Sequence, residues 1–164
     1  MEITHAFIIQ FLHDYRNNTA ERVPPFHRNI SRSILKAPKY YFYDTGQVND
    51  EPGMRLENLV ACALLKEMHF REDCLGEKWS LFFLKNKDGR EIDFLIRKNE
   101  KPALMLEVKW SDAERSPNFS FFEKYLAGTK IIQVVKELKR EKTYPDALEI
   151  RIAHNWLSEM RLEG

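Results

Sequence analysis

Carboxylates and a lysine stand in two neighbouring segments with a spacing that could hold a metal ion and activate water. Residues 90–97 and 103–110 each alternate apolar and polar side chains, which predicts two β-strands joined by a polar tip. Asp93 lies on the first strand, and Glu107 and Lys109 lie on the second. A symmetrical hairpin would place Asp93 opposite Glu107, and like charges in that position destabilise a sheet. We therefore expect a cation between the two carboxylates.

The same hairpin should have one wholly apolar face, because side chains on a strand alternate with a period of two. On that face the expected cross-strand pairs are Ile92–Val108, Phe94–Leu106 and Ile96–Leu104. On the polar face, Glu91 would lie opposite Lys109 and form an ion pair with it.

The residue types suit a magnesium ion. Mg²⁺ takes oxygen ligands and is commonly held by one or two carboxylates, several waters and a substrate phosphate. Glu107 and Lys109 would be about 6.5 Å apart along one strand and would share a face. One of them can therefore hold the metal while the other orients a water molecule or contacts a phosphate. No Cys-x-x-Cys motif or Cys/His cluster indicates a zinc site.

A helix predicted over residues 54–69 should bring a third carboxylate to the sheet. At 100° per residue its apolar stripe consists of Leu56, Leu59, Val60, Ala63 and Leu64. Glu57 falls within this stripe or at its edge, unlike an ordinary solvated glutamate. It either belongs to the site or is a structural carboxylate that an arginine or a backbone amide satisfies.

The other elements indicate an α/β fold. Residues 79–85 have the pattern of a strand and precede a strong turn, so three antiparallel strands should follow the first helix. The chain then predicts an amphipathic helix over 118–126, a buried strand over 130–135, a final strand over 147–152 and a closing helix over 153–162.

The N-terminal part is less regular. We interpret residues 4–36, which contain a turn signal and two prolines, as a β-hairpin. Residues 39–46 predict a short buried strand that ends at a turn, where Asp44 would bond nearby backbone amides. The Asp-Thr-Gly triplet at that turn also occurs in aspartic proteases, but little here supports their long two-lobed or dimeric β-fold.

The composition is that of a folded chain without extreme charge. The 164 residues are 43% hydrophobic and 12% aromatic, which suffices for one globular domain with a core. A net charge of +1 neither indicates nor excludes nucleic-acid binding, because a local basic groove can exist within a neutral total. The two cysteines fit a reduced cytoplasmic chain, and no apolar run approaches the ~18 residues that span a bilayer.

The spacing of the charged residues resembles the PD-(D/E)xK nuclease core. Glu57 lies on a helix, and Asp93 is followed by thirteen residues and then Glu107-Val108-Lys109, although an isoleucine stands where the superfamily name has proline. More narrowly, four motifs in family order resemble the C-terminal domain of prokaryotic AAA-type ATP-binding proteins, catalogued as domain of unknown function 4143. They are KYYFYDTG at 39–46, RLENLV at 55–60, GREIDF at 89–94 and LEVK at 106–109.

The resemblance implies an αβββαβ core with a mixed central sheet flanked by helices, formed by residues 37–164. Residues 1–36 would be an N-terminal extension or hairpin, the remnant of an upstream module. In that family an ATPase module and a winged-helix segment precede this region. The chain has no Gly-x-x-x-x-Gly-Lys-Ser/Thr loop, so we expect no ATP site of that kind in it.

The resemblance also implies roles for the site residues. Asp93, Glu107 and the backbone carbonyl of Val108 would bind Mg²⁺ or Mn²⁺. Lys109 would position the attacking water, and Glu57 would orient the site or bind the metal through water. The implied catalytic set is thus Lys109, Glu57, Asp93 and Glu107.

Other side chains could assist this set. Glu91 fits only the narrower family, and Gln133 lies on a strand that could bring it to the same face. A nuclease groove also needs positive charge to hold phosphates. The candidates are Arg28, Arg32, Lys36, Lys39, Lys85, Lys87 and Arg90.

Three functional hypotheses follow. The first is an Mg²⁺-dependent enzyme that hydrolyses phosphodiester bonds of DNA. The second is a catalytically inactive nuclease-fold module that binds nucleic acid or protein partners and regulates the ATPase. The third is a plain structural domain with solvated carboxylates, which is difficult to reconcile with Asp93 facing Glu107. The sequence leaves the oligomeric state open, a homo-oligomer included, and indicates no membrane partner.

Overall fold

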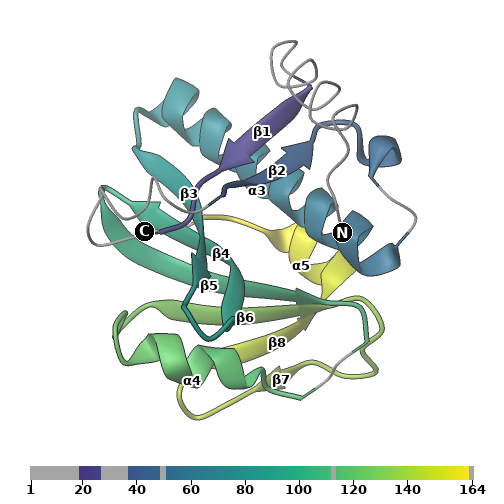
Figure 1. The fold of residues 1–164 in the computed structure, drawn as a ribbon, viewed down its shortest axis with the longest axis vertical. Helices are drawn as coiled ribbons and strands as arrows, with labels where there is room; N and C mark the ends of the chain where they lie inside the picture. The colour runs from purple at the N-terminus through teal and green to yellow at the C-terminus, as the bar shows by residue number, and fades with distance from the viewer. Residues whose placement is uncertain (1–18, 27–36, 49–50, 112–113, 163–164) are drawn as a thin grey trace.

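The computed structural model describes residues 19–26, 37–48, 51–111 and 114–162, which form a mixed α/β structure. Its six-stranded mixed sheet has the order β3-β4-β5-β6-β8-β7 (Figure 1). The strands are β3 (Trp79–Lys85), β4 (Glu91–Lys98), β5 (Lys101–Lys109), β6 (Lys130–Val135), β7 (Lys142–Thr143) and β8 (Leu148–Ile152). The other described elements are the helices α3 (Pro52–Leu75), α4 (Pro117–Glu123) and α5 (Ala153–Glu159), the short 3-10 helix η1 (Thr45–Gln47), and a two-stranded sheet of β1 (Ala20–Val23) and β2 (Lys39–Phe42).

The expected order of helix, three antiparallel strands, helix and strand is present. β3, β4 and β5 are antiparallel neighbours, whereas β6 lies parallel to β5 and β8 lies parallel to β6. Parallel neighbours need a crossover connection, and the segment with α4 provides it between β5 and β6. This topology sets the ends of β5 and β6 side by side.

Helices cover both faces of the sheet (Figure 1). On one face, here called the α3 face, α3 and α5 pack through residues such as Val60, Leu64 and Trp156, none more than 5% exposed. On the other, the α4 face, α4 packs through Phe119 and Phe122. The sheet is therefore buried on both sides, and the core has two layers.

α3 is longer than predicted. It runs from Pro52 to Leu75 instead of 54–69. It begins with proline, which is tolerated in the first helical turn because the N–H that proline lacks would be unpaired there. Gly76 ends the helix in the left-handed region, with a φ of 66°. The apolar stripe stops before this cap, so the pattern alone underestimated the helix.

The buried side of α3 differs in part from the predicted stripe. Three of its predicted members are buried, namely Leu56, Val60 and Leu64. Leu59, however, is 44% exposed. Asn58 is buried instead because its amide accepts from the backbone N–H of Phe42 and donates to the carbonyl of Phe42, both at 2.8 Å. The helix is thus oriented by a polar anchor to β2.

A β-bulge in β4 changes the face of residues near the candidate site. The register with β3 shifts between Phe82 and Leu84, so that two β4 residues, Asp93 and Phe94, oppose one residue of β3. Ile92 consequently packs on the α4 face, whereas Phe94 packs on the α3 face. The prediction that these two share a face was wrong, because strict alternation fails at the extra residue.

The β4–β5 hairpin keeps part of the predicted register. The confirmed pairs are Phe94–Leu106 and Ile96–Leu104. The other predicted pairs lie beyond the end of the described ladder; they are Ile92–Val108, Asp93–Glu107 and Glu91–Lys109. At the opposite end, Asn99 and Glu100 form a tight turn with φ values of 47° and 67°, as a type I′ turn requires.

The N-terminal hairpin prediction lies mostly outside the described residues. Of residues 4–36 only 19–26 are described, and there β1 pairs antiparallel with β2. After β2, the carboxylate of Asp44 accepts a hydrogen bond from the N–H of Gly46 at 2.9 Å, as predicted. β2 is less buried than expected, since within it Tyr41 alone is fully buried.

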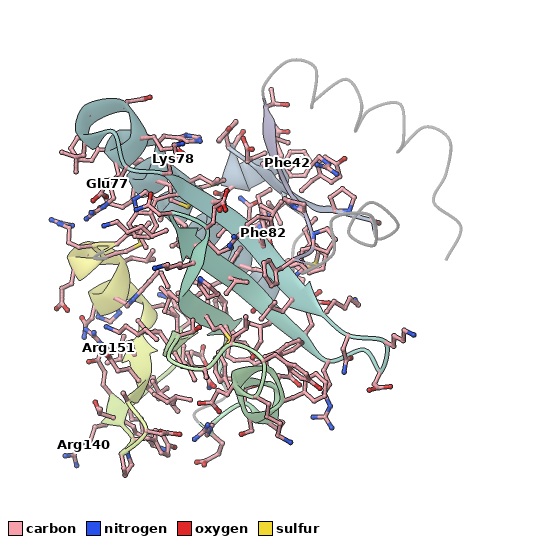
Figure 2. All side chains as sticks on the ribbon, turned by 90° about the vertical axis from the view of Figure 1, so that its left-hand side faces the viewer. Phe42, Glu77, Lys78, Phe82, Arg140 and Arg151 are labelled. Atoms are coloured by element: carbon pink, nitrogen blue, oxygen red, sulfur yellow. The ribbon has the colours of Figure 1, made fainter. Side chains whose placement is uncertain are left out.

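The C-terminal elements follow the predicted order with shifted ends, except that the two-residue strand β7 was not predicted. β6 has the predicted bounds, whereas α4 ends at Glu123 instead of 126 and α5 at Glu159 instead of 162. Figure 2 shows Phe42 near the top of the molecule and Arg140, in the segment between β6 and β7, at its bottom. No helix among the described residues is long and apolar enough to cross a membrane.

Candidate active site

Charged side chains from β2, α3 and β4 meet on the α3 face. Lys39 places its ammonium nitrogen 2.6 Å from Glu91 and 2.9 Å from Glu57. Asp93 lies 3.6 Å from the same nitrogen. A cavity of about 570 Å³, which both Lys39 and Glu57 line, adjoins the cluster. One lysine therefore links three carboxylates beside an accessible space.

Two hydrogen-bond donors fix Glu57. The hydroxyl of Tyr41 donates at 2.7 Å to the same Oε1 atom that Lys39 contacts. Burial, together with the nearby charge of Glu57, raises the pKa of Tyr41 well above its usual range. Burial alone would lower the pKa of Lys39, but the neighbouring carboxylates outweigh it and raise this pKa. Both groups therefore remain protonated donors at neutral pH.

Between β4 and β5, the carboxylate of Asp93 accepts a hydrogen bond that a backbone carbonyl would accept in a regular ladder. Its Oδ2 atom accepts a hydrogen bond from the backbone N–H of Val108 at 2.8 Å. Within a strand, the N–H and the C=O of one residue point toward the same neighbouring strand, so the carbonyl of Val108 also lies on the Asp93 side. The bulge thus brings a carboxylate and a carbonyl to the same gap in the ladder.

The surroundings of Asp93 disfavour its ionised form. The pKa of Asp93 is raised from 3.8 to about 7, first by burial and then by the charges of Glu57 and Glu107. Lys39 and the N–H of Val108 oppose it. The contribution of Glu107 shows that its charge acts on Asp93 although the two are not a ladder pair. A bound cation would relieve this repulsion.

Glu107 is the most buried of these carboxylates, with its side chain 2% exposed. Its Oε1 atom lies 2.6 Å from the ammonium of Lys109. Its Oε2 atom is buried and has no hydrogen-bond partner among the described residues. An unpartnered buried carboxylate oxygen is costly, and a metal ion is one of the few partners that can satisfy it.

The protein offers only a small set of ligands for Mg²⁺ or Mn²⁺. Among the described residues, no three or more His, Cys, Asp and Glu side chains are placed together to hold a metal ion. Glu107 follows Met105 onto the α4 face by alternation and so lies apart from Glu57 on the α3 face. What remains is Asp93, Glu107 and the carbonyl of Val108, and Mg²⁺ accepts such a set because it keeps several waters.

The predicted ion pair between Glu91 and Lys109 is not the arrangement observed. Glu91 pairs with Lys39 and, at 2.7 Å, with Lys85, while Lys109 pairs with Glu107. Burial would raise the pKa of Glu91, but the two lysines lower it overall. The bulge is the physical reason for the change, because it leaves Glu91 and Lys109 on opposite faces of the sheet.

Gln133 lies beside Glu107 in the register of β5 and β6 and is fully buried. Its Oε1 atom accepts from the N–H of Ser116 at 3.0 Å, and its Nε2 atom donates to the carbonyl of Glu114 at 2.8 Å. Gln133 therefore holds the segment before α4 on the face that carries Glu107.

Some of the basic side chains that were predicted to hold phosphates make other contacts. Lys39 and Lys85 bind Glu91, and the guanidinium of Arg90 lies 5.5 Å from the ring centroid of Phe121. Lys87 is exposed in the turn before β4. The predicted cations outside the described residues are Arg28, Arg32 and Lys36.

Sequence reasoning missed the central position of Lys39 and the supporting roles of Tyr41 and Asn58. Their signal was present, because Lys39 and Tyr41 belong to the motif at 39–46, and Asn58 follows Glu57 in the motif at 55–60. The alternation of Lys39 and Tyr41 on one short strand places both on the side of Glu57.

Fold and site together define a mixed α/β domain with a partly buried carboxylate–lysine cluster where two strands separate. A protein-family model described as "Domain of unknown function (DUF4143)" matches residues 52–152, and the chain belongs to that family. The match includes Glu57, Asp93, Glu107 and Lys109 but not Lys39. No curated protein and no solved structure matches the chain.

Proposed function

We propose that this domain is a metal-dependent nuclease with a PD-(D/E)xK core that hydrolyses phosphodiester bonds of DNA. The observation that carries the proposal is the carboxylate of Glu107, whose Oε1 atom contacts Lys109 while its Oε2 atom is buried without a described partner. Together with Asp93, on which the charge of Glu107 acts, these residues have the types that metal-assisted hydrolysis requires.

The order of elements supports the proposal. α3, the antiparallel strands β3 to β5, α4 and the parallel strand β6 follow the αβββαβ order of the nuclease core. The proposed site lies where the β4–β5 ladder ends, so backbone groups are available for ligands there. In the longer parent protein, an AAA-type ATPase module would precede this domain.

Asp93, Glu107 and the carbonyl of Val108 would hold Mg²⁺ or Mn²⁺. When bound, such an ion polarises a phosphoryl oxygen and lowers the pKa of a coordinated water. Lys109, whose side chain is 36% exposed, would orient that water or balance the charge that develops on the phosphate. Its contact with Glu107 keeps the ammonium beside the ligand oxygens.

Glu57 would act as a positioning residue. Lys39 and Tyr41 hold its Oε1 atom, and its charge acts on Asp93. Glu57 would therefore fix the orientation and charge of the Asp93 side of the site, or bind the metal through a water molecule.

A second candidate is a catalytically inactive module that binds nucleic acid or protein partners and regulates the ATPase. The specific observation in its favour is Lys39, whose ammonium already lies among three carboxylates. In this case Lys39 would supply permanently the positive charge that a metal supplies in an active site.

Metal binding provides the first test. Mn²⁺ is titrated calorimetrically into wild type, Asp93→Ala and Glu107→Gln, with Asp73→Ala on the exposed side of α3 as the matched control. We expect binding by the wild type and the control, and loss of binding in the two site variants. Absence of binding by the wild type would reject the metal site and favour the inactive module.

Plasmid nicking in Mg²⁺ separates the two candidates. Wild type should nick supercoiled DNA, Lys109→Ala should not, and Lys66→Ala, at an exposed position of α3, should behave as wild type. Equal cutting by wild type and Lys109→Ala would identify a contaminating nuclease. Metal binding without any cutting would support the inactive module.

A further inference from the structure

A pocket of about 440 Å³ lies on the α3 face at the ends of β5 and β6. Its volume is within the range of about 300–1,000 Å³ typical of small-molecule sites. The residues that matter for its chemistry are Arg55, Leu59, Trp110, Lys136, His154 and Leu157. They come from the start of α3, from the ends of β5 and β6, and from the start of α5.

Trp110 is the distinctive side chain of this pocket. It is 36% exposed, whereas Trp79 and Trp156 are 6% and 5% exposed. Leu59, at 44% exposed, lies in the same lining. The pocket therefore presents an accessible indole ring and an aliphatic wall, which suits a flat apolar group.

The polar part of the lining is basic. The charged or titratable residues among the described lining are Arg55, Lys136 and His154, and none of the described lining residues is a carboxylate. A flat apolar group that carries a negative charge matches both properties of the pocket. A nucleobase with its adjoining phosphate is such a group.

The pocket adjoins the end of the strand that carries the proposed active site. Trp110 directly follows Lys109, the last residue of β5, so their Cα atoms are about 3.8 Å apart. The Lys109 side chain contacts Glu107 on the α4 face, whereas Trp110 lines the pocket on the α3 face. The N–H of Lys136 donates to the carbonyl of Lys109 at 3.0 Å, which fixes the base of the pocket to the strand that carries the proposed site.

We propose that this pocket binds an unpaired nucleobase, stacked on Trp110 with its phosphate at Lys136, and that the domain therefore prefers single-stranded DNA or an unpaired end. The inference rests on the proposed function, from which it takes the phosphodiester substrate. A DNA strand that contacts Lys109 on one face of the sheet and Trp110 on the other must bend round the end of β5. A stiff duplex cannot make that bend, and its bases are already stacked and paired.

An acidic peptide is the competing occupant, since it also carries negative charge and apolar groups. The nucleobase is favoured because the neighbouring residue Lys109 belongs to a site suited to phosphodiesters. Only a polynucleotide would use both features with one continuous ligand. The peptide therefore serves as an outcome of the test.

Binding is tested in EDTA, so that cleavage does not interfere. The probes are a ten-nucleotide oligo-dT, the corresponding dT·dA duplex and a glutamate-rich peptide of similar charge. Oligo-dT should quench tryptophan fluorescence, because Trp110 is the most exposed of the three tryptophans. Trp110→Ala should weaken binding about 5- to 150-fold, the range for loss of one base stack.

Trp110→Phe keeps an aromatic ring and guards against a folding defect. It should retain oligo-dT binding by fluorescence anisotropy and lose the quenching. Lys136→Ala should weaken binding and reduce its salt dependence. Tyr125→Ala, which removes an exposed aromatic residue outside the pocket, should change nothing.

Three results would overturn the inference: equal binding of oligo-dT by wild type and Trp110→Ala, equal affinity for the duplex, or equal quenching by the peptide. The two proposals fail separately. Stacking on Trp110 without metal binding or nicking would reject the nuclease and leave the pocket assignment standing. Metal-dependent cutting with unchanged oligo-dT binding in Trp110→Ala would reject the pocket alone.

Discussion

Replacing Asp93 with asparagine should stabilise the metal-free protein. Asp93 is 16% exposed, and its neighbours include the carboxylates of Glu57 and Glu107. Asparagine has nearly the same shape, and its Oδ1 atom can still accept the hydrogen bond from Val108. The substitution therefore removes a disfavoured charge and keeps the backbone contact.

The expected magnitude follows from the pKa of Asp93. It rises from 3.8 to about 7, a difference of about 3, and one pKa unit is worth about 1.4 kcal/mol. Ionised Asp93 thus costs about 4 kcal/mol of unfolding free energy. The raised pKa already includes the attraction to Lys39, 3.6 Å away. The NH₂ group of asparagine needs a hydrogen-bond acceptor of its own, which offsets part of the gain. We expect a net stabilisation of about 1–3 kcal/mol near pH 8, at about 2–4 °C in Tm per kcal/mol.

The sign of the pH dependence is determined by the raised pKa. Because the folded-state pKa exceeds the unfolded value, the native state binds more protons between these two values. Wild type therefore loses stability as the pH rises from about 4 to about 7, whereas the asparagine variant has no proton to lose there. The charged groups that face Asp93 are Lys39 from β2, Glu57 from α3 and Glu107 from β5. The difference in unfolding free energy between the two proteins should grow as the pH rises from about 4 to about 7 and should vanish below about 4.

Urea unfolding in EDTA at a series of pH values measures this difference. Asp73→Asn, at an exposed position of α3, is the matched control and should follow wild type. Lower stability of Asp93→Asn near pH 8 would refute the reasoning and identify Asp93 as a structural ion-pair partner. A stability difference that is independent of pH would rule out the titration of Asp93 as its cause.

Three further substitutions test other parts of the structure. Lys39→Met leaves three carboxylates without their shared cation and should cost about 3–5 kcal/mol in EDTA, with partial recovery in Mn²⁺ measured by Tm. Asn58→Ala removes two partly buried hydrogen bonds to the backbone of Phe42 and should cost about 2–4 kcal/mol in urea unfolding. Hydrogen bonds from Lys98 and Trp79 lower the pKa of Glu77 to about 2, so this carboxylate stabilises wild type above pH ~4.5. Wild type should therefore be more stable than Glu77→Gln at neutral pH, and acid titration followed by circular dichroism should show this advantage disappearing as the pH falls toward 2.

Elements that depend on local pattern could be predicted from the sequence. β3 and β6 have the predicted bounds, since their apolar patterns are closed on both sides by polar turn residues. The antiparallel order of β3, β4 and β5 follows from the short connections between them. The end of α3 could not be placed, because its last turns carry no apolar stripe and the stop is a glycine beyond them.

The faces of Glu91 and Asp93 depend on the bulge in β4, and alternation cannot reveal a bulge. Asp93 was predicted to face Glu107 across the sheet, whereas its carboxylate bonds the N–H of Val108. The position of Lys39 depends on how β2 docks on α3 through Asn58, a contact between residues far apart in the chain. Such contacts are decided by packing of the whole domain, not by local propensity.

Lysine side chains of the protein supply part of the positive charge that was predicted between the carboxylates. The ion pairs of the site join four carboxylates to three lysines, so one negative charge remains uncompensated. Glu57, Glu91 and Glu107 each have a lysine nitrogen within 2.9 Å, so the excess charge falls chiefly on Asp93, with its raised pKa, while the Oε2 atom of Glu107 has no hydrogen-bond partner among the described residues. A proton on Asp93 can neutralise this charge in acid, and a metal ion can do so above pH ~7. The proton and the metal ion compete for the same negative charge, so the affinity for Mn²⁺ should increase as the pH rises toward ~7. An affinity that is independent of pH would place the ion elsewhere.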